Sequence, residues 1–243
     1  MNAGLTLATA RRVLDQLRHD RRTIVLLVAV PALLLVLLRY VFDSVSVFDR
    51  IAPALLGIFP FLLMFLVTSV ATLRERTTGT LERLMTTPLG KVDLLAGYAA
   101  AFGAVSLAQV VVAATVAYWL GLTVLGSWWA LLVVTLIDAL LGVALGLLAS
   151  AYAATEFQAL QLMPLVVLPQ LLLCGLFQPR GEMATVLRWV SNVLPVSYAV
   201  SALQRVATQP DIDAYYLRDV AVVAGFSAVA LVLAAATLRR RTD

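Results

Sequence analysis

The chain contains 243 residues, of which 62% are hydrophobic and 13% are charged, and its mean hydropathy is +0.95. Soluble domains carry about 25% charged residues, so this composition predicts an all-α, polytopic membrane protein that forms one transmembrane domain over residues 1–243. Spans of about 20 residues each use up the chain, so we expect no soluble catalytic domain within it. One cysteine and one histidine exclude a disulfide framework and a structural zinc site made from this chain alone.

Residues 1–22 predict an amphipathic helix that lies in the headgroup region of the bilayer with its apolar face down. That face carries, at helical spacing, Leu7, Ala10, Val13, Leu14 and Leu17. For the first apolar run, residues 23–42, a secretory signal peptide is the alternative interpretation. No small-residue cleavage site follows the first apolar run, so the sequence favours a signal anchor.

Six apolar segments are long enough to cross a membrane. They cover residues 23–42, 51–73, 94–120, 128–151, 157–177 and 217–238. The connection between the fifth and sixth segments, residues 178–216, is the long one. The sequence therefore predicts a six-span helical bundle.

The basic residues indicate the orientation of these spans. A net charge of +4 would favour nucleic acid as a partner of a soluble chain, but here 12 of the 18 basic residues lie at the two termini and in the connection between the second and third spans. By the positive-inside rule these three regions are cytoplasmic. We therefore expect a multi-pass protein of the plasma (inner) membrane that binds no nucleic acid.

Residues 74–91 form the most densely charged connection of the chain. Charged groups do not enter hydrocarbon, so this loop must lie in water, within reach of a soluble partner. Thr78 or Thr80 can cap the start of a short helix there, and Thr87-Pro88 ends it because the residue before a proline is excluded from the α region.

This short helix has a small apolar face, formed by Leu81, Leu84 and Met85 at i, i+3 and i+4. Two helical turns are not stable alone in water, so the helix must pack on another surface. The bilayer surface and a partner subunit both fit such a face.

The long outer connection predicts two short amphipathic helices, over residues 182–192 and 197–206, with a break at Pro195. Both are apolar enough to enter the membrane, which would make residues 178–216 a re-entrant hairpin. An interfacial loop that lies flat on the bilayer fits the sequence equally well.

Asp138 is a carboxylate near the middle of the fourth span, where insertion costs roughly 2.5 to 3.5 kcal/mol. With Gly142, Gly146 and Ser150 it forms a stripe of residues four apart, which permits close approach of a second helix. Two roles are open for Asp138: a proton or cation contact in a transport path, or a hydrogen-bonded group that fixes helix packing.

The fifth span carries residues that interrupt an apolar helix. Pro164 and Pro169 free backbone carbonyl groups, and Gln161 and Gln170 add polar groups that require protein or water around them. Lining a transport path and ordinary hydrogen bonding between helices are both open for these residues.

Two motifs resemble those of a known family. The first is the run from Glu75 to Glu82, followed by Leu84 and Thr87-Pro88; the second is Cys174-Gly175-Leu176-Phe177-Gln178-Pro179 with Trp189, residues 194–199 and 203–205. In this order on a six-span pattern they are similar to the permeases of ABC exporters of the second type, which include daunorubicin-resistance and nodulation-factor export permeases. Two positions depart from the family pattern, Thr77 in place of a second Glu and Tyr98 in place of a Lys.

The resemblance implies a coupling helix over residues 80–87 that docks on a separately encoded ATP-hydrolysing subunit. The residues implied in this coupling are Arg74, Glu75, Arg76, Gly79, Thr80, Leu81, Glu82, Leu84, Met85, Thr87 and Pro88. The resemblance also implies that a second permease subunit, identical or different, completes the transport path. ATP and Mg²⁺ would be bound by the partner, and this chain would bind no cofactor.

For the outer side, the resemblance implies that residues 182–206 act as a gate. The residues of this outer gate are Phe177, Pro179, Trp189, Pro195, Tyr198 and Arg205.

No G-x-x-x-x-G-K-[ST] motif occurs in the chain, because Gly90-Lys91 is followed by Val92 and lacks the earlier glycine. We therefore expect the chain to have no nucleotide site of its own. The resemblance implies the permease subunit of an exporter, and the compact loops and apolar spans favour an amphiphile such as a drug, an antibiotic or a lipid as its substrate. Export of a glycan or lipid-linked saccharide is an alternative substrate class. An intramembrane enzyme is disfavoured because no second carboxylate, His pair or Ser/Lys dyad accompanies Asp138, and a passive channel or membrane anchor would lack an ATPase partner.

Overall fold

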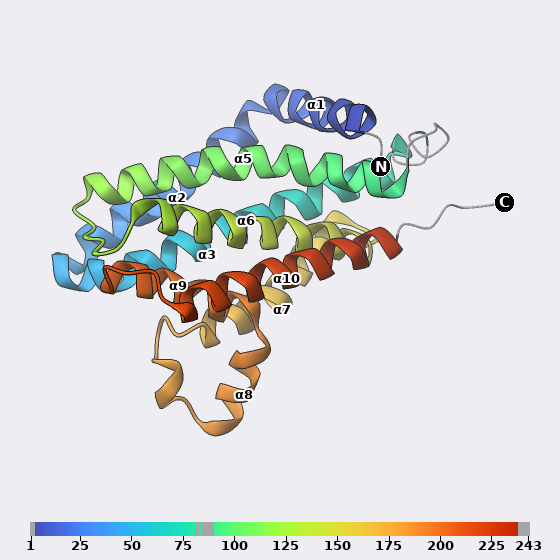
Figure 1. The fold of residues 1–243 in the computed structure, drawn as a ribbon. Helices are drawn as coiled ribbons and strands as arrows, with labels where there is room; N and C mark the ends of the chain where they lie inside the picture. The colour runs from blue at the N-terminus through green and yellow to red at the C-terminus, as the bar shows by residue number, and fades with distance from the viewer. Residues whose placement is uncertain (1–2, 81–82, 84–89, 238–243) are drawn as a thin grey trace.

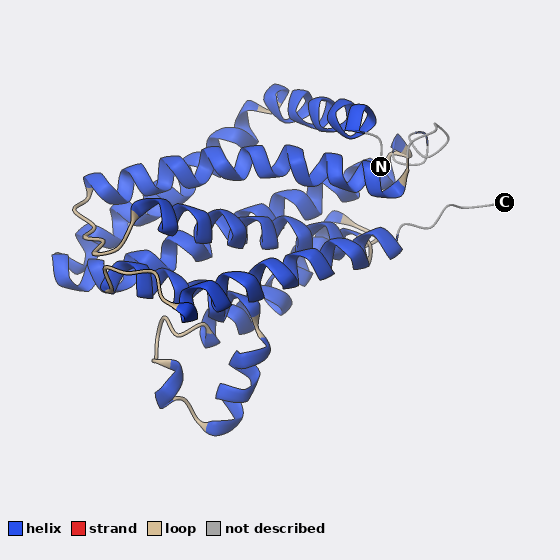
Figure 2. Cartoon of the chain, viewed as in Figure 1, coloured by secondary structure: helices blue, strands red, loops and turns tan. Residues whose placement is uncertain are grey.

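The computed structural model describes residues 3–80, 83 and 90–237, and this part of the chain forms helices joined by loops, with no strand in it (Figure 2). The long helices are α1 (Ala3–His19), α2 (Arg21–Phe42), α3 (Val45–Thr77), α5 (Lys91–Trp119), α6 (Trp128–Ser150), α7 (Glu156–Leu173) and α10 (Ala214–Thr237). Shorter elements follow α7, namely the 3₁₀ turn η1 (Arg180–Glu182), α8 (Thr185–Val193) and α9 (Pro195–Thr208). Six of these helices are long and apolar enough to cross a membrane, which confirms the predicted six-span all-α class.

Helices α3 and α6 form the centre of the bundle, and α5, α9 and α10 pack around this pair (Figure 1). The α3–α6 seam is close because two glycines of α6 face backbone atoms of α3. A Cβ atom at Gly142 would lie 2.3 Å from the carbonyl oxygen of Phe61, and one at Gly146 would lie 2.6 Å from that of Phe65. Small residues of this kind allow two membrane helices to pack at backbone distance.

Local signals explain where several helices begin. Asp20 caps α2, since its carboxylate accepts hydrogen bonds from the backbone N–H of Thr23 at 3.2 Å and from its hydroxyl at 2.6 Å. These bonds lower the pKa of Asp20. Thr155 caps α7 by accepting from the N–H of Gln158, and Pro195 begins α9 at the position where proline is favoured.

Several predicted boundaries were wrong. The second span is α3, which begins at Val45 and continues to Thr77, so Arg74, Glu75 and Arg76 belong to its last turn and not to a loop. Charged residues do not end a helix; α3 ends just before Gly79, whose φ of +73° is left-handed. The fifth span ends at Leu173 rather than at residue 177, and α8 and α9 begin and end a few residues away from the predicted 182–192 and 197–206.

The amphipathic helix at the start of the chain forms as predicted, but its apolar face is turned differently. Thr9, Ala10, Val13 and Leu17 are buried, mainly against α5. Leu7, which was predicted on the apolar face, is 71% exposed. The apolar stripe of α1 therefore covers another helix of the same chain.

The long outer connection consists of two dissimilar helices. The axes of α8 and α9 meet at 91° where Leu194 joins them. Helix α9 is largely buried between α3, α6 and α10, whereas α8 lies beside the bundle and is held mainly through the segments on either side (Figure 1). Of the residues in α8, Ser191 is the one that is buried.

Candidate coupling site at the end of α3

The last turn of α3 carries Arg74, Glu75 and Arg76, which point toward different neighbouring helices. Thr78 stabilises the end of the helix, since its hydroxyl donates to the carbonyl oxygen of Arg74 at 2.8 Å. Of the two predicted caps of the next helix, Thr78 or Thr80, Thr78 instead caps the end of α3, and Thr80 already has helical backbone. The next helical turn begins after Gly79, whose carbonyl oxygen accepts from the N–H of Arg83 at 3.1 Å.

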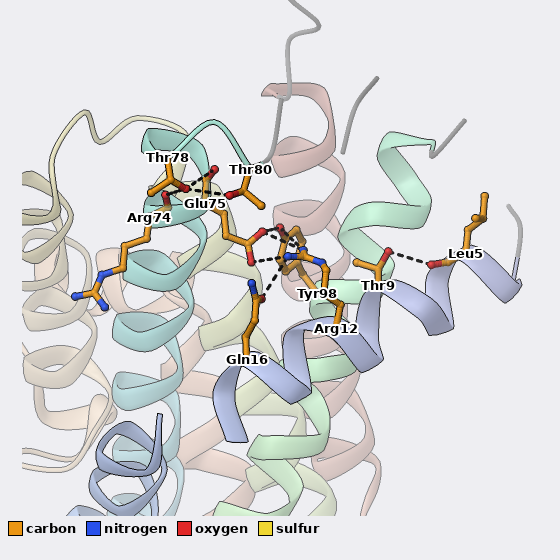
Figure 3. A network of polar contacts seen from close by, with 9 residues as sticks. All are labelled: Leu5, Thr9, Arg12, Gln16, Arg74, Glu75, Thr78, Thr80 and Tyr98. Carbon is orange, nitrogen blue, oxygen red and sulfur yellow. Dashed lines mark hydrogen bonds and ion pairs between the residues drawn. The ribbon is translucent and has the colours of Figure 1, made fainter. Parts of the chain in front are cut away.

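Glu75 is the centre of a polar network that joins α1, α3 and α5 (Figure 3). Arg12 of α1 holds it with two parallel bonds, from Nη1 to Oε1 at 3.1 Å and from Nη2 to Oε2 at 3.0 Å. Tyr98 of α5 donates its hydroxyl to the same carboxylate and accepts from Nη2 of Arg12 at 3.2 Å. The guanidinium of Arg12 also lies 5.9 Å from the centre of the Tyr98 ring. Two-pronged Arg–carboxylate pairs are strong and fix orientation as well as distance.

The surroundings of Arg12 favour the charged form of its guanidinium. Burial disfavours the charged form of Arg12, but the hydrogen bonds to Glu75 and its negative charge outweigh that cost, so the pKa of Arg12 is raised above its ordinary value. The side chains of Arg12 and Glu75 are 28% and 13% exposed. The pair is therefore more sheltered from water than a surface salt bridge.

A close backbone approach holds α1 in place beside this network. A Cβ atom at Gly97 would lie 2.5 Å from the Cβ of Thr9 and 3.0 Å from the carbonyl oxygen of Thr6. Glycine at position 97 is thus required for α1 to pack on α5, and it brings Arg12 within reach of Tyr98, the next residue on α5. Tyr98 takes part in the polar contacts at the position where the family pattern has a Lys.

The two arginines of the same turn point toward the α6–α7 region. Arg76 donates from Nη1 to the backbone carbonyl oxygen of Ser150 at 2.8 Å. Arg74 pairs with Glu156, the first residue of α7, through Nε at 2.7 Å and Nη2 at 3.0 Å. This second ion pair is open to solvent, with the side chains of Arg74 and Glu156 60% and 48% exposed. The last turn of α3 is therefore connected to α1 and α5 on one side and to α6 and α7 on the other.

The structure describes part of the predicted coupling segment. Thr80 and Arg83 have helical backbone, and the hydroxyl of Thr80 lies 3.1 Å from that of Thr78. Outside the described residues are Leu81, Glu82, Leu84, Met85, Thr87 and Pro88.

The predicted outer-gate residues are distributed over the segment after α7, helix α8 and helix α9. Phe177 and Trp189 are 66% and 71% exposed, and Pro179 precedes η1. Pro195, Tyr198 and Arg205 belong to α9.

Polar contacts tie α9 to its neighbours near these outer-gate residues. The hydroxyl of Tyr198 donates to the carbonyl oxygen of Asn192 at 2.7 Å. Arg205 pairs with Asp213 at 2.8 Å and lies 4.8 Å from the ring centre of Tyr215. The Tyr198 bond joins α9 to α8, and the Arg205 contacts join α9 to the start of α10.

Asp138 is fully buried, and neither carboxylate oxygen has a hydrogen-bond partner among the described residues. Gly57 of α3 lies opposite, since a Cβ atom there would be 3.2 Å from Oδ2 of Asp138. The described part of the chain brings no three His, Cys, Asp or Glu side chains together as metal ligands.

The polar residues of α7 separate into two groups. Gln161, Pro164 and Pro169 lie on its exposed side. Gln170 is buried and joins α7 to α9, because its Oε1 accepts from the N–H of Val196 at 3.4 Å while its Nε2 donates to the carbonyl oxygen of Val166.

Three residues that contact the last turn of α3 were missed by sequence reasoning: Arg12 and Tyr98, which bind Glu75, and Glu156, which binds Arg74. Arg12 and Glu75 are 63 residues apart in the chain, and Tyr98 follows Glu75 by 23. Arg12 lies on the polar side of an amphipathic helix among other charges, so no local pattern singles it out. Tyr98, as a polar residue beside Gly97 near the start of a span, was the available signal.

The comparisons with known proteins agree with this architecture. Residues 4–207 match the ABC-2 type transporter family. Over 157 residues, which are 64% of the chain and 22% of the relative, the sequence is 27% identical to ABC transporter G family member 20 of Dictyostelium discoideum. Over 169 residues, which are 68% of the chain and 45% of the relative, it is 27% identical to the probable multidrug ABC transporter permease YbhS of Escherichia coli K12. The chain matches less than half the length of these curated relatives.

Proposed function

This chain belongs to the ABC-2 type transporter family, and we propose that it works as the transmembrane permease of an ATP-driven exporter. A separately encoded ABC ATPase binds ATP and Mg²⁺ and supplies the energy. A second permease subunit, identical or different, completes the transport path. Both termini and residues 74–91 face the cytoplasm of a cell whose plasma (inner) membrane holds the protein.

The last turn of α3 is the observation that carries this proposal. One helix of 33 residues runs through the bundle and ends directly before Gly79, which is followed by Thr80 with helical backbone. That end is joined by ion pairs and hydrogen bonds to α1, α5, α6 and α7. A force applied to the segment after Gly79 is therefore passed to the central seam through a stiff element, as a rigid-body transition requires.

The transport cycle follows from this connection. Closure of the ATPase on ATP moves the coupling helix at residues 80–87, and α3 moves with it because it directly precedes that segment in the chain. Helices α1 and α5 follow α3 because the Arg12–Glu75–Tyr98 contacts join them to its end. The path at the interface of two permease subunits then changes its exposure from the inner to the outer side, where α8 and α9 form the gate.

An amphiphile such as a drug, an antibiotic or a lipid is the proposed substrate. The similar YbhS protein is named a probable multidrug permease, and α7 exposes apolar side chains, including Leu165 at 69% and Leu172 at 56%, next to polar Gln161. A glycan or lipid-linked saccharide remains the alternative substrate for the same architecture.

The substitution Leu84→Asp tests the coupling role. A charge on the apolar face of the coupling helix should abolish co-purification of the ATPase, while the six spans still insert. Leu125→Asp is the matched control, since Leu125 is 66% exposed on the loop at the other end of the bundle. Co-purification from membranes that express both subunits, quantified against the permease, is the measurement. An ATPase signal unchanged in Leu84→Asp would remove the coupling role from this segment.

A further inference from the structure

A recess opens at the end of α3 remote from the Glu75 network. It has a volume of about 860 Å³ and lies between the end of α2, the start of α3, the segment after α7 and the last turns of α9. Its walls are mainly apolar, with Leu38 and Leu55 on one side and Leu176 on another. A volume in the range of 300–1,000 Å³ with a few polar groups is typical of a small-molecule site.

Some of the polar side chains that line this recess have hydrogen-bond partners in the protein, and others have none among the described residues. Asp49 accepts from the backbone N–H of Thr123 at 3.0 Å with one carboxylate oxygen and from its hydroxyl with the other. Arg50, the next residue on α3, is exposed and lines the same recess, and none of the ion pairs or hydrogen bonds between described residues involves it. The side chain of Gln204 on α9 also lines the recess, and it forms no hydrogen bond with the described residues.

The recess therefore combines an apolar body with one cation and one amide that are open to a ligand. A carboxylate, sulfonate or phosphate group would fit Arg50, because a charge-assisted hydrogen bond to guanidinium is the strong interaction available there. Asp49 keeps its negative charge, but both of its oxygens are engaged by Thr123, so Arg50 is the charged side chain of this pair that is available to the head group of a ligand.

We propose that this recess binds an amphiphile with an anionic head group, held by Arg50 and Gln204, and an apolar body that packs on Leu38, Leu55 and Leu176. The inference adds a ligand class to the proposed exporter. Binding itself does not rest on that function; only transport of the bound molecule does. The occupant is an anionic lipid of the bilayer or a free anionic amphiphile, and both share this chemistry.

The test uses dansyl-undecanoic acid and its uncharged methyl ester with the purified full chain in neutral maltoside micelles, read by dansyl fluorescence. We expect Arg50→Gln to weaken binding of the acid about tenfold and to leave the ester unchanged. Arg188→Gln on exposed α8 is the matched control and should change neither. Equal binding of the acid to Arg50→Gln, or an equal loss for both probes, would overturn the assignment of Arg50.

A second measurement locates the site without a mutation. A diazirine-bearing fatty acid should cross-link mainly to peptides that contain residues 38–55 and 175–179; labelling spread evenly over α7, α8 and α10 would refute the recess.

In nanodiscs, displacement of the acid probe by phosphatidylglycerol but not by phosphatidylcholine would identify a bilayer lipid as the occupant, and no displacement by either would identify a free amphiphile. No ATP or ATPase is present in these assays, so their failure leaves the exporter proposal standing, and failure of the Leu84→Asp test leaves the recess standing.

Discussion

Helices α6 and α7 are both predicted spans that contact α3, yet they occupy opposite kinds of place. Within an apolar stretch of 18 residues in each helix, 61% of the residues of α6 are buried inside the protein, compared with 17% of those of α7. Helix α6 meets α3 at backbone distance through Gly142 and Gly146. Helix α7 is joined to α3 and α9 by longer contacts, among them the Arg74–Glu156 ion pair and the Gln170 amide.

This difference shows what selects the centre of a membrane bundle. Lipid and protein interior are equally apolar, so hydropathy does not decide which helix is enclosed. Helix α2 has the highest mean hydropathy of the six spans, yet only 17% of the residues in its apolar stretch are buried. Close packing decides instead, because small residues in α6 allow dispersion contacts along the whole seam that the larger side chains of α7 do not allow.

The largest expected effect comes from breaking the α3–α6 seam. In Gly142→Leu the new side chain would begin 2.3 Å from the Phe61 carbonyl oxygen, so the helices must separate, at a cost of about 3 kcal/mol or more. Gly225→Leu on α10 is the control, since nothing lies within 4 Å of a Cβ atom there. Thermal unfolding in detergent, followed by size-exclusion chromatography, measures the difference. Equal unfolding temperatures for the two variants would show that the seam does not determine stability.

The sheltered ion pair at the end of α3 comes next. Arg12→Gln leaves Glu75, which is 13% exposed, without its two-pronged partner, and we expect a loss of about 2 kcal/mol of unfolding free energy. The double variant Arg12→Gln/Glu75→Gln should recover part of this loss, because no unpaired carboxylate remains. Additive losses in that double-mutant cycle would mean that the two residues do not interact.

The amide of Gln170 tests how firmly α7 is held to α9. Gln170→Leu removes the acceptor of the Val196 N–H, and we expect a loss of about 1 kcal/mol. Gln161→Leu, on the exposed side of the same helix, should leave stability unchanged. Hydrogen exchange at Val196 measures the effect directly, and exchange at the wild-type rate in Gln170→Leu would contradict this role.

The smallest effect belongs to the exposed ion pair between α3 and α7. Arg74→Gln should cost less than about 1 kcal/mol, because both partners are about half exposed. The difference from the wild type should shrink further in 1 M salt, where the Debye length is about 3 Å. A loss as large as that of Arg12→Gln would show that α7 is held to α3 as firmly as α1 is.

The sequence predicted much of the fold from local signals. Six apolar runs gave the six spans, and the apolar spacing of residues 1–22 gave α1, since both patterns follow from helix geometry. The ends of the helices were less certain. The charges of Arg74, Glu75 and Arg76 suggested a loop, whereas the helix continues until Gly79 supplies a left-handed conformation.

The residues of the candidate site were likewise predicted only in part. Glu75 was found from the sequence because it belongs to a recognisable motif. Its partners Arg12 and Tyr98 were not, because their contact depends on how α1 packs against α5 at Gly97 and Thr9. A contact between side chains far apart in the chain, such as Arg12 and Glu75, produces no recognisable pattern in the sequence around either residue.

The sequence by itself determined that the chain crosses a membrane as six helices, because backbone hydrogen bonding in lipid leaves an apolar run few other structures, and it singled out the charged residues at the end of the second helix. Only the tertiary structure decided which helices are central, which way α1 turns its apolar stripe, and which charges meet at the end of α3. Those outcomes depend on shape and on close backbone approach between segments far apart in the chain, and hydropathy does not encode either.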